Sequence, residues 1–362
     1  MTADTALVDP PAPTASLVRR ARGGSTLWRY VLIRFLLIFP TVLILVTTVF
    51  VLMRATGDPI TAALGGQLTP TQLAERIEAA GYDRPLAVQY LEYLGRIAVG
   101  DFGTTLDNQR VVDVLLRYGG ATLELAVYAL LVAFAVGIPL GMIAAAVRDR
   151  WGDAVLRVFA ILCYATPVFF AGIVLKLVFS VWLGVLPTSG RASPRVEIAL
   201  NRIDGATGVY TIDAIRTGNP AYIADVLSHA VLPGLALGLL TAGVFLRLVR
   251  TNVIGTLSMP YIDAARSRGI RETRLVATHA YRPALIPIIT VIGLQIAMLL
   301  GGAVLTETTF EWTGLGFQLS EFLKARDFVA VQGIVALLAV IVAVSNFVVD
   351  IIAAFIDPRV RY

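Results

Sequence analysis

Six long stretches of this chain contain no Asp, Glu, Lys or Arg, and they limit the possible folds more than any other feature of the sequence. The hydrocarbon core of a bilayer is about 30 Å thick, so an α-helix needs about 20 apolar residues to cross it. Inside lipid every backbone polar group must find a partner within the protein, which favours helices for separate runs of this length. The charge-free runs occupy residues 35–53, 125–147, 158–175, 230–246, 283–306 and 328–349.

With their flanking residues these runs predict an all-α integral membrane protein with six transmembrane helices. Hydrophobic residues make up 57% of the chain and charged residues 15%, against roughly 45–50% and about 25% in an ordinary soluble domain. A soluble protein that buried six such helices would need a far larger polar shell, so a soluble fold is excluded. The expected spans are residues 30–53, 121–147, 155–185, 229–250, 283–306 and 328–356.

The distribution of charge around these spans predicts an orientation. Six spans place both termini on one side, and cytoplasmic loops carry an excess of Lys and Arg. The side of the termini has seventeen Arg and seven acidic residues, whereas the other side has twelve basic and sixteen acidic residues. Glu124, Lys176 and Asp350 lie within or at the edges of spans and complete the net charge of +5. Both termini are therefore expected in the cytoplasm, and the basic pI indicates membrane orientation, with no nucleic-acid partner.

The sequence lacks the motifs of an ATPase and of a metal hydrolase. Neither Lys176 nor Lys324 follows a glycine, so the phosphate-binding G-x-x-x-x-G-K-S/T loop of an ATPase is absent. The two histidines are far apart, and no H-E-x-x-H motif occurs. Cys163 stands alone and can form neither an intrachain disulfide nor a thiolate metal site. We expect no catalytic residue, no metal site and no cofactor bound by this chain.

The regions outside the spans have their own compositions. Residues 1–26 are rich in Pro and Gly and predict a disordered cytoplasmic tail, followed by a single transmembrane domain over residues 27–362. Residues 54–118 form an outer segment that is too long for a simple connector. Residues 186–228 form a second outer segment, for which the sequence predicts only a mixed loop.

Two helices are expected in the first outer segment. Thr69 is suited to cap the first, Gln72 completes a capping box, and Gly81 is suited to end the helix. The second begins near residues 83–85 and has an apolar face at helical spacing. Two interpretations of this face stay open: it packs on the membrane or on the protein's own helices, or it receives a partner. The apolar positions are Leu86, Tyr90, Leu94 and Ile97.

The cytoplasmic loop over residues 251–282 is the most informative part of the sequence. Pro260 suits the first turn of a helix, Asp263 favours its positive end, and Gly269 can adopt the left-handed conformation that ends it. A second short helix is expected from about Arg271, ending before Pro283. Ala264 and Ala265 allow a partner to approach closely, and they are surrounded by positive charge from Arg266, Arg268, Arg271 and Arg274.

The run from Asp263 through Ala264 and Ala265 to Gly269 resembles the E-A-A-x-x-x-G loop of ABC importer permeases, with Asp in place of the usual Glu. Further stretches are similar to the B-type permease of the dipeptide/oligopeptide import family, and the resemblance runs in order from about residue 30 to the end. They are DRPLAVQYLEYLGRIAVGDFGTTL at 83–106, HAYRPALIP at 279–287, GGAVLTETTFEWTGLG at 301–316 and DPRVR at 357–361.

The resemblance implies the type I ABC importer (MetI-like) permease fold in a bacterial cytoplasmic (inner) membrane. It also implies a heterodimer with a homologous second permease, two ATPase subunits that carry ATP and Mg, and an extracytoplasmic substrate-binding protein. The ATPase-coupling residues would be Asp263, Ala264, Ala265, Arg266, Gly269 and Arg271. Di- and oligopeptides are the substrates expected from the resemblance, and glutathione, nickel complexes and oligosaccharides are the family's alternatives, which the sequence of this subunit does not exclude. A self-contained secondary transporter is a weaker alternative, because the sequence has no clear internal repeat.

Polar residues within the expected spans are candidates for the translocation path. Lys176 either reaches outward or pairs structurally, or it attracts a substrate carboxylate from the cavity. Glu124 is either an interfacial carboxylate or part of the path. Gln295 and Asn346 either bond across helices or contact substrate.

Overall fold

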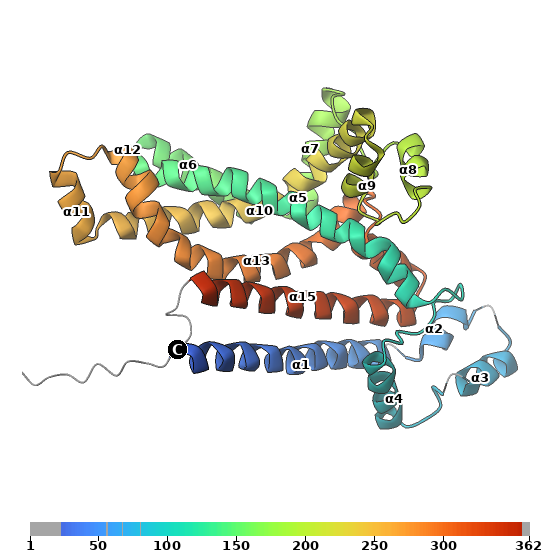
Figure 1. Cartoon of the computed structure of the whole chain (residues 1–362). Helices are drawn as coiled ribbons and strands as arrows, with labels where there is room; N and C mark the ends of the chain where they lie inside the picture. Colours follow the sequence, from blue (N-terminus) through green and yellow to red (C-terminus); the bar gives the residue numbers. More distant parts are fainter. Residues whose placement is uncertain (1–22, 56, 67, 80, 357–362) are drawn as a thin grey trace, which may run out of the picture.

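The computed structural model describes residues 23–55, 57–66, 68–79 and 81–356 (Figure 1). Within these ranges the chain is helical and contains no strand, only an isolated bridge between Thr104 and Arg110. Of the tail expected over residues 1–26, residues 1–22 lie outside the described part. Residues 23–26 instead form the first turn of α1, because lengthening an existing helix adds a backbone hydrogen bond for each residue fixed.

The long helices follow the charge-free runs. They are α1 (Gly23–Ala55), α5 (Val111–Ala146), α10 (Pro220–Leu257), α13 (Tyr281–Phe310) and α15 (Phe328–Ile356). In the described part, four of them (α1, α5, α10 and α15) are long and apolar enough to cross a membrane, and a bent pair of helices adds a fifth candidate. α13 contains the fifth charge-free run and packs between α10 and α15.

The residues of the expected third span, 155–185, form a bent pair of helices. α6 (Trp151–Ala165) is followed by α7 (Val168–Leu175) and a π-helical turn, η1 (Lys176–Trp182), with a bend of 105° between the two parts. The break lies at Thr166 and Pro167. Proline has no N–H for the helix ladder, and it disfavours the helical conformation of the residue before it, so Thr166 is extended with ψ 126°. Proline within a charge-free run therefore ended this helix.

Figure 1 shows the long helices running between two ends of the molecule. α1 and α15 lie side by side and run in opposite directions, and Arg34 Nη1 lies 3.3 Å from Asp350 Oδ2 near the start of α1. The same end holds α11 (Pro260–Ser267) and α12 (Glu272–Arg274). The opposite end holds the helices of both outer segments. The start of α1, the end of α15 and the 251–282 loop thus share one end.

The first outer segment contains α2 (Pro59–Leu64), α3 (Pro70–Ala79) and α4 (Leu86–Ala98). The predicted capping box is confirmed, because the Thr69 amide donates to Gln72 Oε1 at 3.2 Å and the Gln72 amide donates to Thr69 Oγ1 at 3.4 Å. Gly81 follows α3 with φ +73°. Tyr90 packs α4 onto α1 through a 2.6 Å hydrogen bond with Thr47, whereas Leu86 is exposed. The apolar positions of α4 are thus divided between a contact inside the protein and its surface.

The second outer segment is more ordered than the mixed loop expected for residues 186–228. It forms α8 (Pro194–Asn201), α9 (Tyr210–Thr217) and the first two turns of α10. Ser193 precedes Pro194, and Asn219 caps α10 by accepting from the Ala221 amide at 3.0 Å. These elements bury a small apolar core of their own, made of Ala192, Val196, Leu200, Tyr210, Ala214 and Val226.

α10 is the central helix, and glycine allows it to lie close to α5. A Cβ at Gly137 would lie 2.7 Å from the Ala242 carbonyl oxygen, and one at Gly238 would lie 2.6 Å from that of Ala129. Small residues let membrane helices approach until their backbones touch. The 38 residues of α10 therefore connect the outer segment rigidly to the 251–282 loop at the other end.

Candidate functional site

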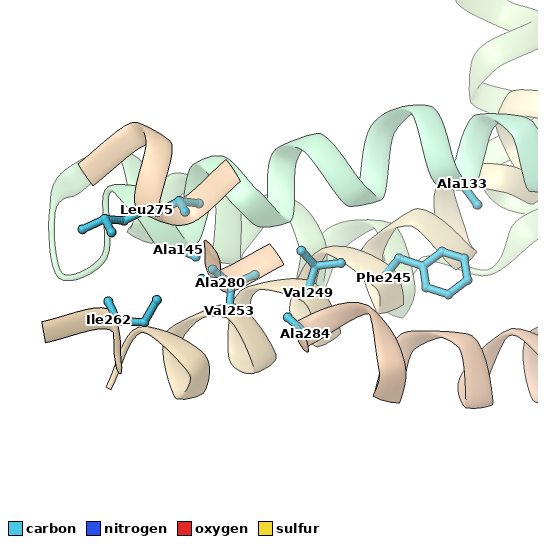
Figure 2. Close-up of a cluster of buried hydrophobic side chains, with 10 residues drawn as sticks. Ala133, Ala145, Phe245, Val249, Val253, Ile262, Leu275, Ala280 and Ala284 are labelled. Atoms are coloured by element: carbon cyan, nitrogen blue, oxygen red, sulfur yellow. The ribbon is translucent and has the colours of Figure 1, made fainter. Parts of the chain in front are cut away.

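One face of α11 fixes the 251–282 loop to the long helices. Ile262 is fully buried, and it packs in an apolar cluster with Val253 of α10, Ala284 of α13, and Leu275 and Ala280 between them (Figure 2). Figure 2 shows Ile262 and Leu275 reaching into this cluster from different segments of the loop. A movement of α11 would therefore be passed directly to α10 and α13.

The other face of α11 is open to solvent. Asp263, Ala264 and Arg266 are exposed, whereas Ala265 is half-buried and packs against the apolar cluster below. The sequence predicts that Ala264 and Ala265 together allow a partner to approach closely, but the two residues lie on different faces of α11. Only Ala264 lies on the exposed face, and Ala265 belongs to the anchored face.

The predicted glycine turn is confirmed. The Gly269 amide donates to the Arg266 carbonyl at 2.9 Å, and the Ile270 amide reaches the Ala265 carbonyl at 3.4 Å. With φ +80° at Gly269, this is the Schellman arrangement that ends a helix and satisfies its last carbonyls. Ile270 and Ala265 both pack against the apolar cluster, so the turn is held from below.

Replacing Gly269 by alanine is expected to loosen this turn, because an L side chain at positive φ costs roughly 1–2 kcal/mol. Hydrogen exchange of the Gly269 and Ile270 amides should then become about 5- to 30-fold faster. The matched control is Gly255→Ala in α10, where the glycine has an ordinary helical φ and open space around its Cβ position. Unchanged exchange in Gly269→Ala would contradict the prediction.

Arg266 organises the charges on the exposed face. Its Nη1 donates to Asp263 Oδ1 at 2.6 Å, and its Nε donates to Glu272 Oε1 at 2.5 Å, so it joins α11 to α12. The Arg266 guanidinium lowers the pKa of the Glu272 carboxyl below its ordinary value. Arg268, Arg271 and Arg274 are also exposed, so four Arg side chains face two acids and this surface carries excess positive charge.

The sequence predicts that the second helix of the loop ends before Pro283, and this prediction is wrong. α12 continues through a π-helical turn, η2 (Leu275–Ala280), directly into α13. A proline within a helix leaves the carbonyl four residues earlier without its usual donor, which here is that of His279. The Tyr261 hydroxyl lies 3.5 Å from this carbonyl and can donate to it. The loop is therefore continuous with α13 and is not a separate hairpin.

A buried ion pair near the same end was missed from the sequence. Asp153 in the first turn of α6 is fully buried, and Arg250 of α10 donates to its two oxygens at 2.6 and 2.7 Å. The Asp149 amide also donates to Asp153 at 3.2 Å. This pair fixes the start of α6 to α10 above the 251–282 loop. The sequence shows each charge, but it does not show that residues 97 positions apart meet.

Glu124, a candidate for the translocation path, lies within a buried polar contact between α5 and the second outer segment. Its carboxylate is 2.6 Å from Arg191 Nη2 and accepts from the Thr211 amide at 2.7 Å. Arg191 also donates to the Gly208 carbonyl at 2.8 Å, and its guanidinium lies 3.7 Å from the centre of the Tyr210 ring. The acid is thus part of the attachment of α9 to α5.

The other three candidates lie apart from Glu124. Lys176 donates from Nζ to the Thr309 carbonyl at 2.9 Å, close to the end of α13. Gln295 is buried in α13 and its Oε1 has no partner, whereas Asn346 is half-buried in α15. Among the described residues, no hydrogen bond or ion pair joins any two of these four side chains, and their place along a path stays a prediction.

A second buried carboxylate was also missed as a site. Glu307 of α13 is fully buried and accepts from Thr122 Oγ1 at 2.7 Å and from the Phe317 amide at 2.8 Å. The Trp312 indole donates to the Ala121 carbonyl at 2.9 Å. Gly314 lies so close that a Cβ there would be 2.5 Å from Glu307 Oε1. The stretch at 301–316 thus folds around its own acid and ties α13 to α5.

Comparisons with known proteins agree with this architecture. Residues 137–362 match the family described as the binding-protein-dependent transport system inner membrane component, and residues 27–110 match the N-terminal region of such membrane components. The chain is 36% identical to the dipeptide transport system permease protein of Escherichia coli over 339 residues, which is 92% of this chain and 99% of the relative.

Two further relatives have similar coverage. The di/tripeptide transport system permease protein of Pseudomonas aeruginosa is 37% identical over 90% of this chain and 96% of its own length. The glutathione transport system permease protein of Salmonella choleraesuis is 34% identical over 92% of this chain and 99% of its own length. The chain therefore belongs to the family of binding-protein-dependent transport system inner membrane components.

Proposed function

We propose that this chain is the permease subunit of an ATP-driven importer of dipeptides, with α11 as the element that ATPase subunits contact. The supporting observation is the division of α11 into an anchored face around Ile262 and an exposed face around Ala264. The dipeptide assignment is supported by the names of the relatives from Escherichia coli and Pseudomonas aeruginosa.

In the proposed assembly the chain crosses the cytoplasmic membrane six times, with both termini and α11 in the cytoplasm. A homologous second permease forms the other half of the path, two ATPases bind below, and a substrate-binding protein delivers the peptide from outside. The chain itself has no catalytic role, because ATP and Mg are held by the ATPases. This arrangement gives the excess of Arg around α11 both an orienting and a docking role.

The proposed mechanism uses the contacts of α11. ATP-driven closure of the ATPases displaces α11, and Ile262 passes this movement to α10 and α13 through the apolar cluster. Because η2 joins the loop to α13 without a break, α13 turns with it. The Asp153–Arg250 pair carries α6 along with α10. The helices then open the path alternately to the two sides of the membrane.

Uptake of labelled alanyl-alanine tests the substrate. A strain that lacks this gene should lose the uptake, and the restored gene should recover it. Glutathione is the second candidate, supported by the relative from Salmonella choleraesuis. An excess of unlabelled dipeptide, and not of glutathione, should compete with the label. Unchanged alanyl-alanine uptake in the deletion strain, together with a loss of labelled glutathione uptake, would overturn the dipeptide assignment while leaving the importer assignment intact.

Lys176 provides a prediction about substrate recognition. Since Nζ is bound to the Thr309 carbonyl, we expect Lys176→Met to weaken the packing of η1 on α13. Uptake of a free-acid dipeptide and of its C-terminal amide should then fall by the same factor, measured in parallel transport assays. A selective loss of the free acid would contradict this prediction and would assign Lys176 to carboxylate recognition.

A further inference from the structure

A recess at the end of the molecule opposite α11 gathers buried polar atoms that have no partner among the described residues. It lies between the last turn of α1, α4 and the first turns of α15, which meet at this end in Figure 1. The unpartnered atoms are Arg54 Nε and Nη1, Gln89 Oε1, Tyr93 Oη and Gln332 Nε2, and all four residues line the recess. Buried polar groups in proteins almost always have partners, so such a group of exceptions indicates a missing ligand.

The chemistry of these atoms favours an anion. Arg54 and Gln332 offer three donor nitrogens, and the Tyr93 hydroxyl can add a fourth donor atom, against one acceptor oxygen from Gln89. Gln332 is 6% exposed and Gln89 is 8% exposed, so bulk water does not replace the missing partners. A site with excess donors around a guanidinium is suited to an oxyanion, because charge-assisted hydrogen bonds are stronger than neutral ones.

Arg54 is held in place while its Nε and Nη1 form no hydrogen bond with the residues that the structure describes. Its guanidinium carbon lies 4.4 Å from the centre of the Tyr82 ring and 5.2 Å from that of Phe50. Aromatic rings stabilise the cation through their faces and leave its edge free for hydrogen bonds. The guanidinium is therefore positioned in advance for a ligand.

Acidic residues at the recess are engaged elsewhere. Glu92 pairs with Arg84 at 2.5 Å, and Asp101 accepts from the Gly103 amide at 2.9 Å. In the described part, neither forms a hydrogen bond with Arg54 Nε or Nη1. These two carboxylates therefore do not accept hydrogen bonds from the buried donors of Arg54, which stay available to a ligand.

The walls of the recess are closely packed. Gly103 has φ +85°, and a Cβ there would lie 2.7 Å from Val329, so only glycine brings the 101–103 loop this near to α15. The recess has a volume of about 60 Å³, several times the roughly 10–15 Å³ that one water requires. A neighbouring cavity of about 770 Å³ shares Tyr82, Arg96 and Asp101 with it and provides a way in.

We infer that this recess binds the oxyanionic group of a small ligand, a carboxylate or a phosphate, with Arg54 as its charged partner and Gln332 and Tyr93 as additional donors. Dissolved anions and the phosphate of an anionic lipid headgroup share this chemistry. The site lies at the far end of the molecule from α11 and is separate from the proposed contact with the ATPases.

Hydrogen exchange with mass spectrometry tests the inference in the full chain, purified in neutral detergent with the partners it retains. Sodium phosphate and sodium acetate are each titrated against sodium chloride at equal ionic strength. Segments 86–103 and 328–333 should become protected, and the protection should saturate with anion concentration. A parallel arm compares phosphatidylcholine nanodiscs with and without phosphatidylglycerol. Protection by phosphate or acetate would identify a dissolved anion as the ligand, and protection only by phosphatidylglycerol would identify a lipid headgroup. Either result supports the site.

Two variants test the residues. Arg54→Met should lower the affinity for the anion by at least about tenfold, since it removes a charge-assisted contact. Gln332→Leu should lower this affinity less, because the variant keeps the charge of Arg54. It also provides a test of the site if Arg54→Met does not fold. Arg202→Met, which removes an exposed Arg in the other outer segment, is the matched control and should leave the protection unchanged. No protection in any arm, or equal protection with and without the Arg54 and Gln332 side chains, would overturn the inference.

Discussion

Ala264→Trp is expected to abolish uptake while the chain still folds and inserts into the membrane. Ala264 lies on the exposed face of α11, whereas Ile262 holds the opposite face in the apolar cluster. Because this anchor prevents α11 from moving away, a large side chain at position 264 must separate the docked ATPase from the loop. We expect a loss of uptake of more than tenfold together with loss of the ATPases on co-purification.

The neighbouring residue provides a sharp contrast. Ala265 packs inward, so Ala265→Trp overfills the cluster beneath α11, and overpacking typically costs about 1–3 kcal/mol. This variant should therefore unfold at a lower temperature, whereas Ala264→Trp should keep the melting temperature of the unchanged protein. Ala87→Trp, at an exposed alanine of α4 at the far end, controls for a bulky surface residue.

Deleting residues 264–269 should have the same effect on transport as Ala264→Trp. It removes Ala264 and Arg266 from the exposed face, together with Ala265 and the glycine turn, but it leaves the long helices unchanged. Normal uptake and normal recovery of the ATPases in both Ala264→Trp and the deletion would refute the proposed role of α11.

The long helices were predictable because a single local property determines them. A run without charge that is long enough for a bilayer favours helix whatever it contacts, although the third run is divided between α6 and α7. The glycine turn after α11 and the capping box of α3 were predictable for a similar reason, since Gly269 and the Thr69–Gln72 pair act within a few residues of themselves.

The proline that breaks the third span is visible in the sequence, but no local rule distinguishes it from the prolines that leave a helix continuous. Pro40, Pro139 and Pro233 also lie in expected spans, and each sits inside a continuous helix. Pro167 instead ends α6. Membrane helices tolerate proline when neighbouring groups satisfy the freed carbonyl, so the outcome depends on packing that the sequence does not display.

The buried polar contacts were the least predictable part. Glu124 was recognised as unusual for its place in a span, but its partner Arg191 lies 67 positions away in a segment without a clear pattern. The same holds for Asp153 with Arg250 and for Glu307 with Thr122. Their formation depends on how the helices pack, which local sequence rules do not determine.

Arg191→Met is expected to produce the largest loss of stability. The Arg191 and Glu124 side chains are 4% and 3% exposed, and their charged atoms are 2.6 Å apart. Removing one member of a buried pair leaves the other charge without compensation, which typically costs about 3–5 kcal/mol. Glu124 would keep its contacts with Thr211 but lose its positive partner, so the attachment of the second outer segment to α5 would be weakened. A strongly lowered melting temperature or loss of folded protein should follow.

A double-mutant cycle separates the pair from its surroundings. Glu124→Gln combined with Arg191→Met removes both charges, so the double variant should be more stable than Arg191→Met alone, although it still lacks the contacts of Arg191 with Gly208 and Tyr210. Lys324→Met is the control, since Lys324 and Glu321 are 69% and 47% exposed and such surface pairs contribute only about 0–1 kcal/mol. If Arg191→Met unfolds at the same temperature as this control, the buried pair does not hold the outer segment to α5.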